Sequence, residues 1–359
     1  MNKISNIQLF SLILVFEIGS TTLFALGIGA NRNAWIVILI SYFLSLSLLW
    51  CYTQIPRYYP NQNFSEILTD SLGVILAKPL LLLYGIYFFN QTTHNFYEFG
   101  VLIRITALPN TPLLVILYLF ILVMIYVLHK GLEVIARSIE IFLPYFVLFL
   151  ILIYFLTFLS EDFQLSNLQP ILGDGFKPVL KEIPTVLAFP FGEMVVFLIF
   201  WHYINKQQLI RRTTFIAVTV SALIITTSLI IFLAILGPEL TSSSEIPLLE
   251  TLLSIHIAMI FTNLDSIGVF IMFIGGFYKT AIHFFAFSLA LTWLFNKSNP
   301  KWVIFIFGLL LPIITQYRFS SLDDQRWKGM EGGVYNILLY SLLPLLILLI
   351  IMVKKKAKN

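Results

Sequence analysis

The stretch Ala188-Phe189-Pro190-Phe191-Gly192-Glu193 interrupts an apolar run that extends from Pro184 to His202. A nearly uncharged run of about twenty residues is long enough to cross a lipid bilayer as a helix. Pro190 removes a backbone donor and clashes with the preceding turn, while Gly192 lowers the cost of non-helical backbone angles. At membrane depth, such a broken backbone persists only where it lines a cavity or is buried in protein. The stretch therefore predicts a discontinuous membrane helix.

The carboxylate of Glu193 decides between two interpretations of this break. A proline kink without any ligand would explain Pro190 alone, and membrane helices tolerate such kinks. A carboxylate inside the membrane is costly, however, and by default indicates a functional site. Discontinuous helices near mid-membrane are typical of transporter binding sites. We therefore expect a binding site at residues 188–193.

The composition is that of a polytopic helical membrane protein. Of the 359 residues, 59% are hydrophobic and 11% are charged, with a mean hydropathy of +0.92, whereas soluble domains carry roughly 25% charged residues. The net charge of +4 does not indicate nucleic-acid binding, because the Lys and Arg residues lie in short loops and at the C-terminal tail. Cys51 is the single cysteine, so an internal disulfide and a cysteine metal cluster are excluded.

Ten apolar runs are expected to span the membrane. The first is a retained span rather than a signal peptide, because Glu17 interrupts it and apolar residues continue to Ala30. The expected spans are residues 7–30, 34–55, 77–103, 112–129, 138–159, 184–203, 213–236, 264–296, 301–316 and 334–353.

The distribution of positive charge predicts that both termini are cytoplasmic. With the N-terminus inside, fourteen Lys and Arg residues lie in the cytoplasm and seven outside, which agrees with the positive-inside rule. The inside set is Lys3, Arg57, Lys78, Lys130, Arg137, Lys206, Arg211, Arg212, Lys297, Lys301, Lys354, Lys355, Lys356 and Lys358. The outside set is Arg32, Arg104, Lys177, Lys181, Arg318, Arg326 and Lys328.

The chain is expected to form a single membrane domain, residues 1–359, built from two halves. Residues 160–183 form an extracytoplasmic connector between a first five-helix repeat, residues 1–159, and a second, residues 184–353. The first span of each half is interrupted, at residues 17–22 and 188–193. Paired broken helices in corresponding positions are typical of an inverted repeat. The basic tail, residues 354–359, either contacts anionic lipid or is a solvated flank of the last span.

The sequence also resembles a known family, the endospore germination permeases, which are the B subunits of GerA-type germinant receptors in spore-forming Firmicutes. The resemblance covers essentially all ten spans. Its most specific parts are Phe189-Pro190-Phe191-Gly192-Glu193 and the preceding Asn167-Leu168-x-Pro170-x-Leu172-Gly173-x-Gly175-x-Lys177-Pro178.

This resemblance implies a fold, a function and partners. The implied fold is that of the amino acid–polyamine–organocation transporters: an all-α, ten-helix, five-plus-five inverted repeat (LeuT-like) in which helices 1 and 6 are broken. The implied function is germinant recognition in the spore inner membrane, with amino acids as the main ligand class and sugars or nucleosides in some receptors. The implied partners are a larger membrane A subunit and a lipid-anchored C subunit, and no cofactor is expected.

In the first span, the residues after Gly19 have two interpretations. Ser20 and Thr21 are good N-caps, and a helix that restarts there would direct its positive dipole end at a ligand carboxylate. Alternatively, their hydroxyls bond to the preceding turn and only bend the helix. In the sixth span, the unwound carbonyls from Phe189 to Phe191 are expected to accept a ligand ammonium.

Glu193 is expected in the first turn of the restarted half-helix, where the helix dipole favours a negative charge. Three roles stay open for it: binding an ammonium, gating a water path, or pairing with a lysine. Lys279 of the eighth span is the only cation well inside the membrane, at a cost of roughly 2.5–3.5 kcal/mol. It needs a carboxylate partner, and the candidates are Glu17 and Glu193.

In the third span, Asn90, His94, Tyr97 and Val101 share one helix face, with Glu98 beside them. This polar stripe either lines the site or forms interhelical hydrogen bonds, worth about 0.6 kcal/mol each on average.

The expected site therefore has two groups of residues. The ligand-binding group is Gly19, Ser20, Thr21, Tyr97, Val101, Phe189, Phe191, Gly192, Glu193, Gly276 and Thr280, and the intramembrane charge or gating group is Glu17, His94, Glu98 and Lys279. No metal site is expected, and no catalytic motif is present. The sequence favours a non-enzymatic sensor of a small germinant, with a proton- or sodium-coupled secondary amino acid permease as the alternative.

Overall fold

The computed structural model describes residues 3–254, 265–331 and 333–356. Residue 264, where the eighth expected span begins, and residues 357–359 of the expected tail lie outside the described residues. Within those ranges the chain is helical, and the one strand-like pairing is an isolated parallel bridge between Ile4 and Ile204.

The helices and their bounds are as follows. The first half contains α1 (Asn6–Thr21), η1 (Ile28–Asn33), α2 (Ala34–Tyr58), α3 (Phe64–Leu72), α4 (Val74–Thr106), α5 (Leu113–Lys130) and α6 (Leu132–Phe158). The second half contains η2 (Leu165–Leu168), α7 (Lys177–Ala188), η3 (Phe191–Ile199), η4 (Trp201–Tyr203), η5 (Gln207–Leu209), α8 (Ile210–Ser243), α9 (Pro247–Leu253), α10 (Asp265–Leu294), α11 (Lys301–Arg318), α12 (Leu322–Arg326), η6 (Trp327–Glu331) and α13 (Val334–Lys356).

These helices agree closely with the expected spans. In the described part of the chain, nine helical segments are long and apolar enough to cross a membrane, and α1 is a further apolar helix of 16 residues. The sixth span begins earlier than expected, because α7 starts at Lys177 rather than near residue 184. Pro178 lies in the first turn of α7, where its missing N–H costs nothing. The connector between the halves is therefore shorter than residues 160–183.

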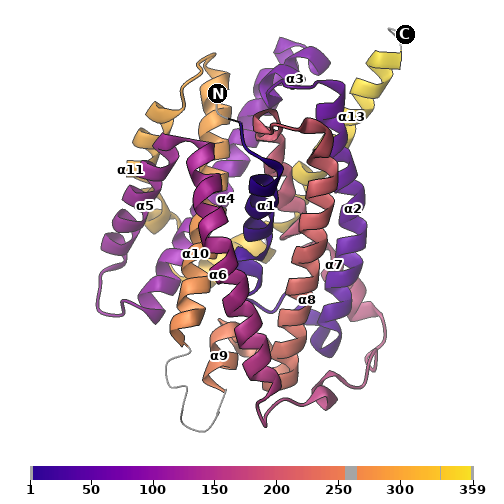
Figure 1. Ribbon diagram of the computed structural model, residues 1–359, viewed down its shortest axis with the longest axis vertical. Coiled ribbons are helices and arrows are strands. Elements are labelled where there is room, and N and C mark those ends of the chain that lie inside the picture. The colour runs from indigo at the N-terminus through magenta and orange to yellow at the C-terminus, as the bar shows by residue number, and fades with distance from the viewer. Residues whose placement is uncertain (1–2, 255–264, 332, 357–359) are drawn as a thin grey trace.

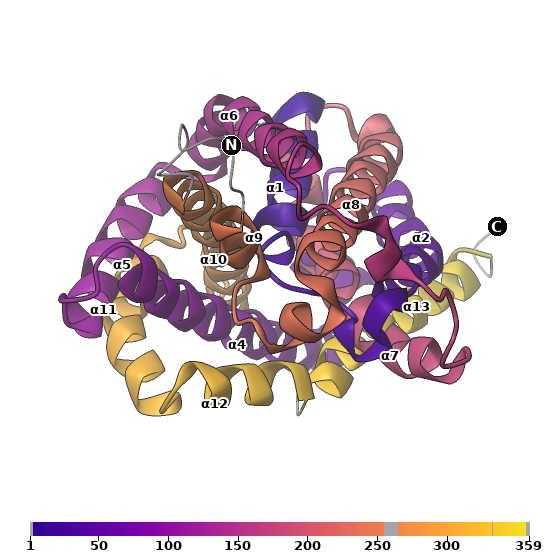
Figure 2. The ribbon, with the colours of Figure 1, turned by 90° about the horizontal axis from the view of Figure 1, so that it is seen from below.

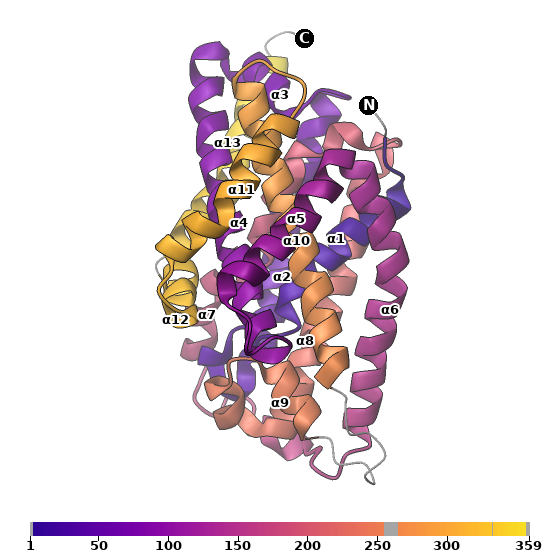
Figure 3. The same ribbon diagram turned by 90° about the vertical axis from the view of Figure 1, so that its left-hand side faces the viewer.

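The two described ends of the chain, at residues 3 and 356, lie at the same end of the bundle, here called the terminal end, and α9 lies at the opposite end (Figure 1). Seen from below, α1 lies between α6, α8 and α10, and it contacts all three (Figure 2). The short helix α12 follows α11 along the outside of the bundle (Figure 3). Helix α4 packs along α10 and also contacts α12. The centre of the molecule is therefore formed by α1, α4, α10 and the broken helix α7–η3.

Two glycines allow α1 and α10 to cross in direct backbone contact. A Cβ built on Gly275 would lie 1.9 Å from the carbonyl oxygen of Gly19, and a Cβ on Gly19 would lie 2.7 Å from the Cα of Gly275. Small residues permit this close approach of membrane helices. Gly19 therefore has a packing role, and it is not among the residues that line the cavity described below.

Candidate ligand-binding site

The break in the sixth span lies where the sequence predicts it. Helix α7 ends at Ala188, Phe189 is extended (φ −128°, ψ 117°), and the Phe189–Pro190 peptide bond is cis. The chain resumes as the 3₁₀ helix η3, and Glu193 lies in its first turn. This break therefore places a carboxylate at a helix N-terminus, where the dipole stabilises it.

The break in the first span lies later than expected. Helix α1 continues through Glu17 and Ser20 to Thr21, and the non-helical segment follows it, before η1 begins at Ile28. The Thr21 and Thr22 hydroxyls donate to the backbone carbonyls of Glu17 and Ile18 in the preceding turn. Ser20 and Thr21 therefore do not cap a restarting helix, and the second interpretation of these hydroxyls holds for Thr21.

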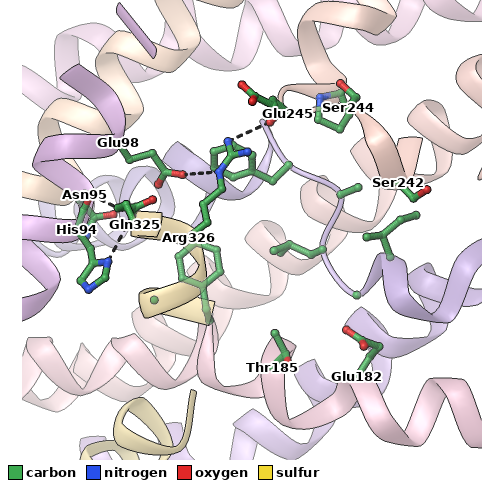
Figure 4. A pocket seen from close by; sticks show the side chains of 18 of the residues that line it. His94, Asn95, Glu98, Glu182, Thr185, Ser242, Ser244, Glu245, Gln325 and Arg326 are labelled. Carbon is green, nitrogen blue, oxygen red and sulfur yellow. Dashed lines mark hydrogen bonds and ion pairs between the residues drawn. The ribbon is translucent and has the colours of Figure 1, made fainter. Parts of the chain in front are cut away.

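A cavity of about 320 Å³ lies between the two breaks (Figure 4). Its lining includes Pro247 at the start of α9, which lies at the end of the bundle opposite the terminal end (Figure 1). Its inner part is buried and contains Glu193 and Gln91, while Ser242 and Glu245 at its other end are exposed. The cavity therefore connects the buried break to the surface. Its lining residues are Phe24, Ala25, Leu26, Gly27, Ile28, Gln91, His94, Asn95, Glu98, Glu182, Thr185, Phe189, Glu193, Thr241, Ser242, Ser244, Glu245, Pro247, Gln325, Arg326, Gly329 and Ile337.

Glu193 forms the inner boundary of the cavity and joins it to Lys279. Its Oε1 accepts a hydrogen bond of 2.6 Å from Gln91 Nε2, and its Oε2 lies 2.7 Å from the ammonium nitrogen of Lys279. The contact with Lys279 is an ion pair rather than an aligned hydrogen bond. Lys279 also donates to Ser20 Oγ at 3.1 Å and lies 4.0 Å from the centre of the Phe189 ring. Lys279 thus links α10 to both broken helices, and its carboxylate partner is Glu193.

Glu17, the other candidate partner of Lys279, is fully buried, and neither of its carboxyl oxygens has a hydrogen-bond partner among the described residues. In this conformation the ammonium of Lys279 therefore pairs with Glu193 and not with Glu17.

Arg326 crosses the outer part of the cavity. Its Nε lies 3.4 Å from Glu98 Oε1, and its Nη2 donates to the backbone carbonyl of Glu245 at 3.1 Å (Figure 4). The guanidinium also lies 5.0 Å from the centre of the Phe24 ring. Arg326 therefore connects α4, the segment before α9 and the segment after α1.

The helix that carries Arg326 is fixed by capping interactions. Ser321 caps α12 by accepting from the backbone N–H of Asp324, and Lys328 donates to Asp324 Oδ2 at 2.8 Å. This hydrogen bond from Lys328, together with those from Ser320, lowers the pKa of the Asp324 carboxyl. Asp324 therefore joins α12 to the residues that directly precede and follow it.

The structure brings four of the expected site residues to the cavity: His94, Glu98, Phe189 and Glu193. The other expected ligand-binding residues lie in helix contacts. A Cβ on Gly192 would lie 2.7 Å from Ser341 Oγ, and a Cβ on Gly276 would lie 2.1 Å from Cγ of the Phe99 ring. Thr280 donates to its own helix at Gly276 O. Tyr97, Val101 and Phe191 are buried away from the cavity lining.

The polar stripe of α4 binds residues of two other helices. Arg318 donates to Thr93 Oγ1 at 2.7 Å, hydrogen-bonds to Asn90 Oδ1, and lies 3.2 Å from His94 Nε2. Gln325 donates to the His94 carbonyl at 3.2 Å. Asn90 and His94 therefore take part in interhelical hydrogen bonds, and His94 also contributes to the cavity wall.

Several lining residues were not expected from the sequence. Gln91 and Asn95 lie on the cavity side of α4, at helical spacing with His94 and Glu98. Their polarity within a membrane span was the available signal. Arg326 and Gln325 come from a short helix far along the chain, and no local pattern in the sequence indicates that they meet α4.

This fold and site define a class of membrane protein. The structure is similar to that of MHP1, a nucleobase-cation-symport-1 family transporter solved in a closed conformation with bromovinylhydantoin bound. The TM-score is 0.67 at 14% sequence identity, and the match covers 97% of this chain and 78% of the transporter. The chain therefore has the LeuT-like transporter fold that the resemblance implied.

Sequence comparison places the chain in one family. The family described as "Spore germination protein" matches residues 3–323. Spore germination protein KB of Bacillus subtilis (strain 168) is 31% identical over 359 residues, which covers 99% of this chain and 96% of that protein. Spore germination protein A2 of the same organism is 24% identical over 340 residues, covering 92% and 90%. The chain belongs to the spore germination protein family, as its sequence motifs predicted.

Proposed function

We propose that this protein is the germinant-sensing subunit of a spore germinant receptor and that an L-amino acid binds in the cavity between the two helix breaks. The observation that carries the proposal is the buried carboxylate of Glu193 at the inner end of a surface-connected cavity. The volume of about 320 Å³ is at the lower end of the range for small-molecule sites. A cavity of this size accommodates a molecule as small as an amino acid.

The charges along the cavity match those of an amino-acid zwitterion. The ligand ammonium would contact Glu193, and the ligand carboxylate would contact Arg326. The 3.4 Å separation between Arg326 and Glu98 is longer than the usual charge-assisted hydrogen bond of about 2.7–2.9 Å. Arg326 therefore retains donors for a ligand carboxylate, while Gln91 and Asn95 supply polar groups between the two charges.

Within the receptor, ligand binding would be signalled to partner subunits in the spore inner membrane. We place a larger membrane A subunit and a lipid-anchored C subunit beside this chain on the strength of its family resemblance. The described helices show a transporter-like bundle whose broken helices meet at the cavity. Closure of these helices around the ligand is the movement that a neighbouring subunit would detect.

A secondary amino acid permease is the second candidate, and the similarity to a symporter favours it. The same cavity would serve both functions, so binding alone does not separate them. Uptake of a bound amino acid into sealed vesicles that contain the purified protein would identify a permease. A sensor would bind the amino acid without net uptake.

Thermal unfolding of the purified protein with each of the twenty L-amino acids tests the proposal. At a concentration one hundred times its Kd, a ligand stabilises the folded protein by about 2.7 kcal/mol. We expect one amino acid or a few related ones to raise the Tm, and Glu193→Gln to abolish that shift. Glu133→Gln is the matched control, because Glu133 pairs with Arg137 outside the cavity. The proposal fails when no amino acid raises the Tm of the wild-type protein.

A further inference from the structure

The buried carboxyl group of Glu17 has no evident structural role in this conformation. It shows no exposed surface, and both oxygens lack a hydrogen-bond partner among the described residues. An ionised carboxylate without compensation is very costly in such surroundings, and the usual response is to take up a proton. Glu17 is therefore a neutral carboxylic acid here.

Lys279 lies against the same part of α1. Its ammonium donates to Ser20, which follows Glu17 by three residues, and it lies 5.2 Å from the ring of Phe16. Residues three apart are neighbours on a helix surface. A lysine ammonium on its flexible four-carbon stem can change partners without movement of its helix. The two carboxyl groups near Lys279 thus lie on different broken helices.

We propose that Glu17 is the reserve partner of Lys279: when a ligand ammonium binds Glu193 from the cavity, Lys279 leaves Glu193 and pairs with Glu17. This inference rests on the proposed function, because it assigns Glu193 to the cationic group of the ligand. It narrows the ligand class to molecules with an ammonium that can donate hydrogen bonds.

The charges balance in both arrangements. Before binding, the ammonium of Lys279 neutralises the Glu193 carboxylate, and Glu17 is neutral. After binding, the ligand ammonium neutralises Glu193, Lys279 neutralises an ionised Glu17, and the proton of Glu17 leaves to water. Each carboxylate then has one cation, and one proton is released for each ligand bound. No unpaired charge stays buried, which is the condition that makes such an exchange feasible.

The other titratable groups around α1 do not offer Glu17 a different cation. From α10, the residues facing this region are Lys279 and His283. The Nδ1 of His283 lies 3.1 Å from the Lys279 carbonyl, and its buried Nε2 has no hydrogen-bond partner among the described residues, which disfavours a charged imidazole. Helix α6 has its last charged residue at Glu140, which accepts from Gln8, nine residues before Glu17. Helix α8 carries no charged residue between Arg212 and Glu239.

Infrared spectroscopy of the protein in lipid vesicles tests the inference without knowledge of the natural ligand. A protonated carboxyl group has a carbonyl-stretch band that is absent from a carboxylate. We expect this band in the wild-type protein at neutral pH and its loss in Glu17→Gln. We also expect its loss in Glu193→Gln, because Lys279 then pairs with Glu17 and ionises it. Persistence of the Glu17 band in Glu193→Gln, or its absence from the wild-type protein, would overturn the proposal.

Methylammonium and tetramethylammonium test the displacement step on the wild-type protein. Methylammonium can donate hydrogen bonds to Glu193, whereas tetramethylammonium cannot. We expect saturating methylammonium to remove the Glu17 band and tetramethylammonium to leave it unchanged. A band that survives methylammonium would refute the displacement of Lys279.

Thermal unfolding provides a second measurement for variants that are poorly stable. We expect the loss of stability in the Glu17→Gln/Glu193→Gln double variant to exceed the sum of the two single losses, since each carboxylate substitutes for the other. Additive losses would contradict a shared partner. Failure of the Glu193→Gln protein to accumulate would also contradict a shared partner, if the Lys279→Met/Glu193→Gln protein does accumulate. None of these results depends on an amino-acid ligand, so they are independent of the ligand panel described above.

Discussion

Lys279 has no exposed surface, and its ammonium is surrounded by groups from the two broken helices. Glu193 supplies the opposite charge, Ser20 supplies a hydroxyl oxygen, and Phe189 presents the face of its ring. The sequence predicts that such a lysine needs a carboxylate, because an unpaired cation inside the membrane is costly. It does not distinguish Glu17 from Glu193, since both carboxylates lie in apolar spans. Only the packing of α10 against η3 and α1 resolves the choice.

Removal of the lysine charge should be strongly destabilising. Lys279→Met leaves the buried Glu193 carboxylate uncompensated, and breaking a buried ion pair in this way costs roughly 3–5 kcal/mol. Arg137→Met is the matched control, because the Arg137–Glu133 pair is on the surface and is worth at most about 1 kcal/mol. Thermal unfolding of the purified proteins measures both. Equal Tm values for the two variants would show that the central ion pair does not stabilise the fold.

At the scale of helices, the contact between α1 and α10 depends on the absence of two side chains. Gly19 and Gly275 face each other with their backbones in contact. This contact also brings Ser20 and Lys279 within hydrogen-bond distance. The geometry of the buried charges is thus a consequence of how closely these helices approach.

A single methyl group at this crossing should separate the helices. In Gly275→Ala, the new Cβ would lie 1.9 Å from the Gly19 carbonyl oxygen, which backbone atoms cannot avoid by a rotamer change. We expect a loss of stability of at least the roughly 1–3 kcal/mol typical of overpacking, seen as a lower Tm and lower yield. Gly85→Ala is the control, since its Cβ would meet Ala290 at an ordinary 3.7 Å. A Gly275→Ala protein with the Tm of Gly85→Ala would contradict the crossing.

Much of the helical framework follows from the sequence, because length and hydropathy determine which segments cross a bilayer. The break at Phe189–Pro190 is equally local, since proline and glycine act on their own turn. The end of α1 is harder to predict from the sequence, because Gly19 can either interrupt a helix or allow a close crossing of two helices. The cavity is the least predictable feature: Arg326 reaches Glu98 and the carbonyl of Glu245 only through tertiary packing.

At the scale of the whole molecule, the two described ends of the chain lie together, at the end of the bundle opposite α9 (Figure 1). Basic residues expected in the cytoplasm, including Lys3 and Lys354–Lys356, belong to this terminal end. The positive-inside rule therefore predicts that the cavity opens to the outer side of the membrane.

Labelling of introduced cysteines tests this orientation. In a Cys51→Ser background, Asp174→Cys should react with a membrane-impermeant maleimide added outside intact cells, and Gln208→Cys should react only after permeabilisation. Both positions are exposed, so differences in labelling report the side of the membrane rather than burial. The reverse pattern would place the cavity on the cytoplasmic side.

The bridge between Ile4 and Ile204 connects the residues before α1 to the residues that follow η3 and η4 of the sixth span. The Ile4 N–H donates to the Tyr203 carbonyl at 2.9 Å, and the Asn205 N–H donates to the Ile4 carbonyl at 3.0 Å. The two interrupted spans are therefore connected at two places. Backbone hydrogen bonds join Ile4 to residues 203 and 205, and Lys279 bridges Ser20 and Glu193 at the breaks. A force applied to the chain before Ser5 is consequently transmitted to residue 204 as directly as to α1. A domain fused at the N-terminus would therefore be mechanically coupled to both interrupted spans.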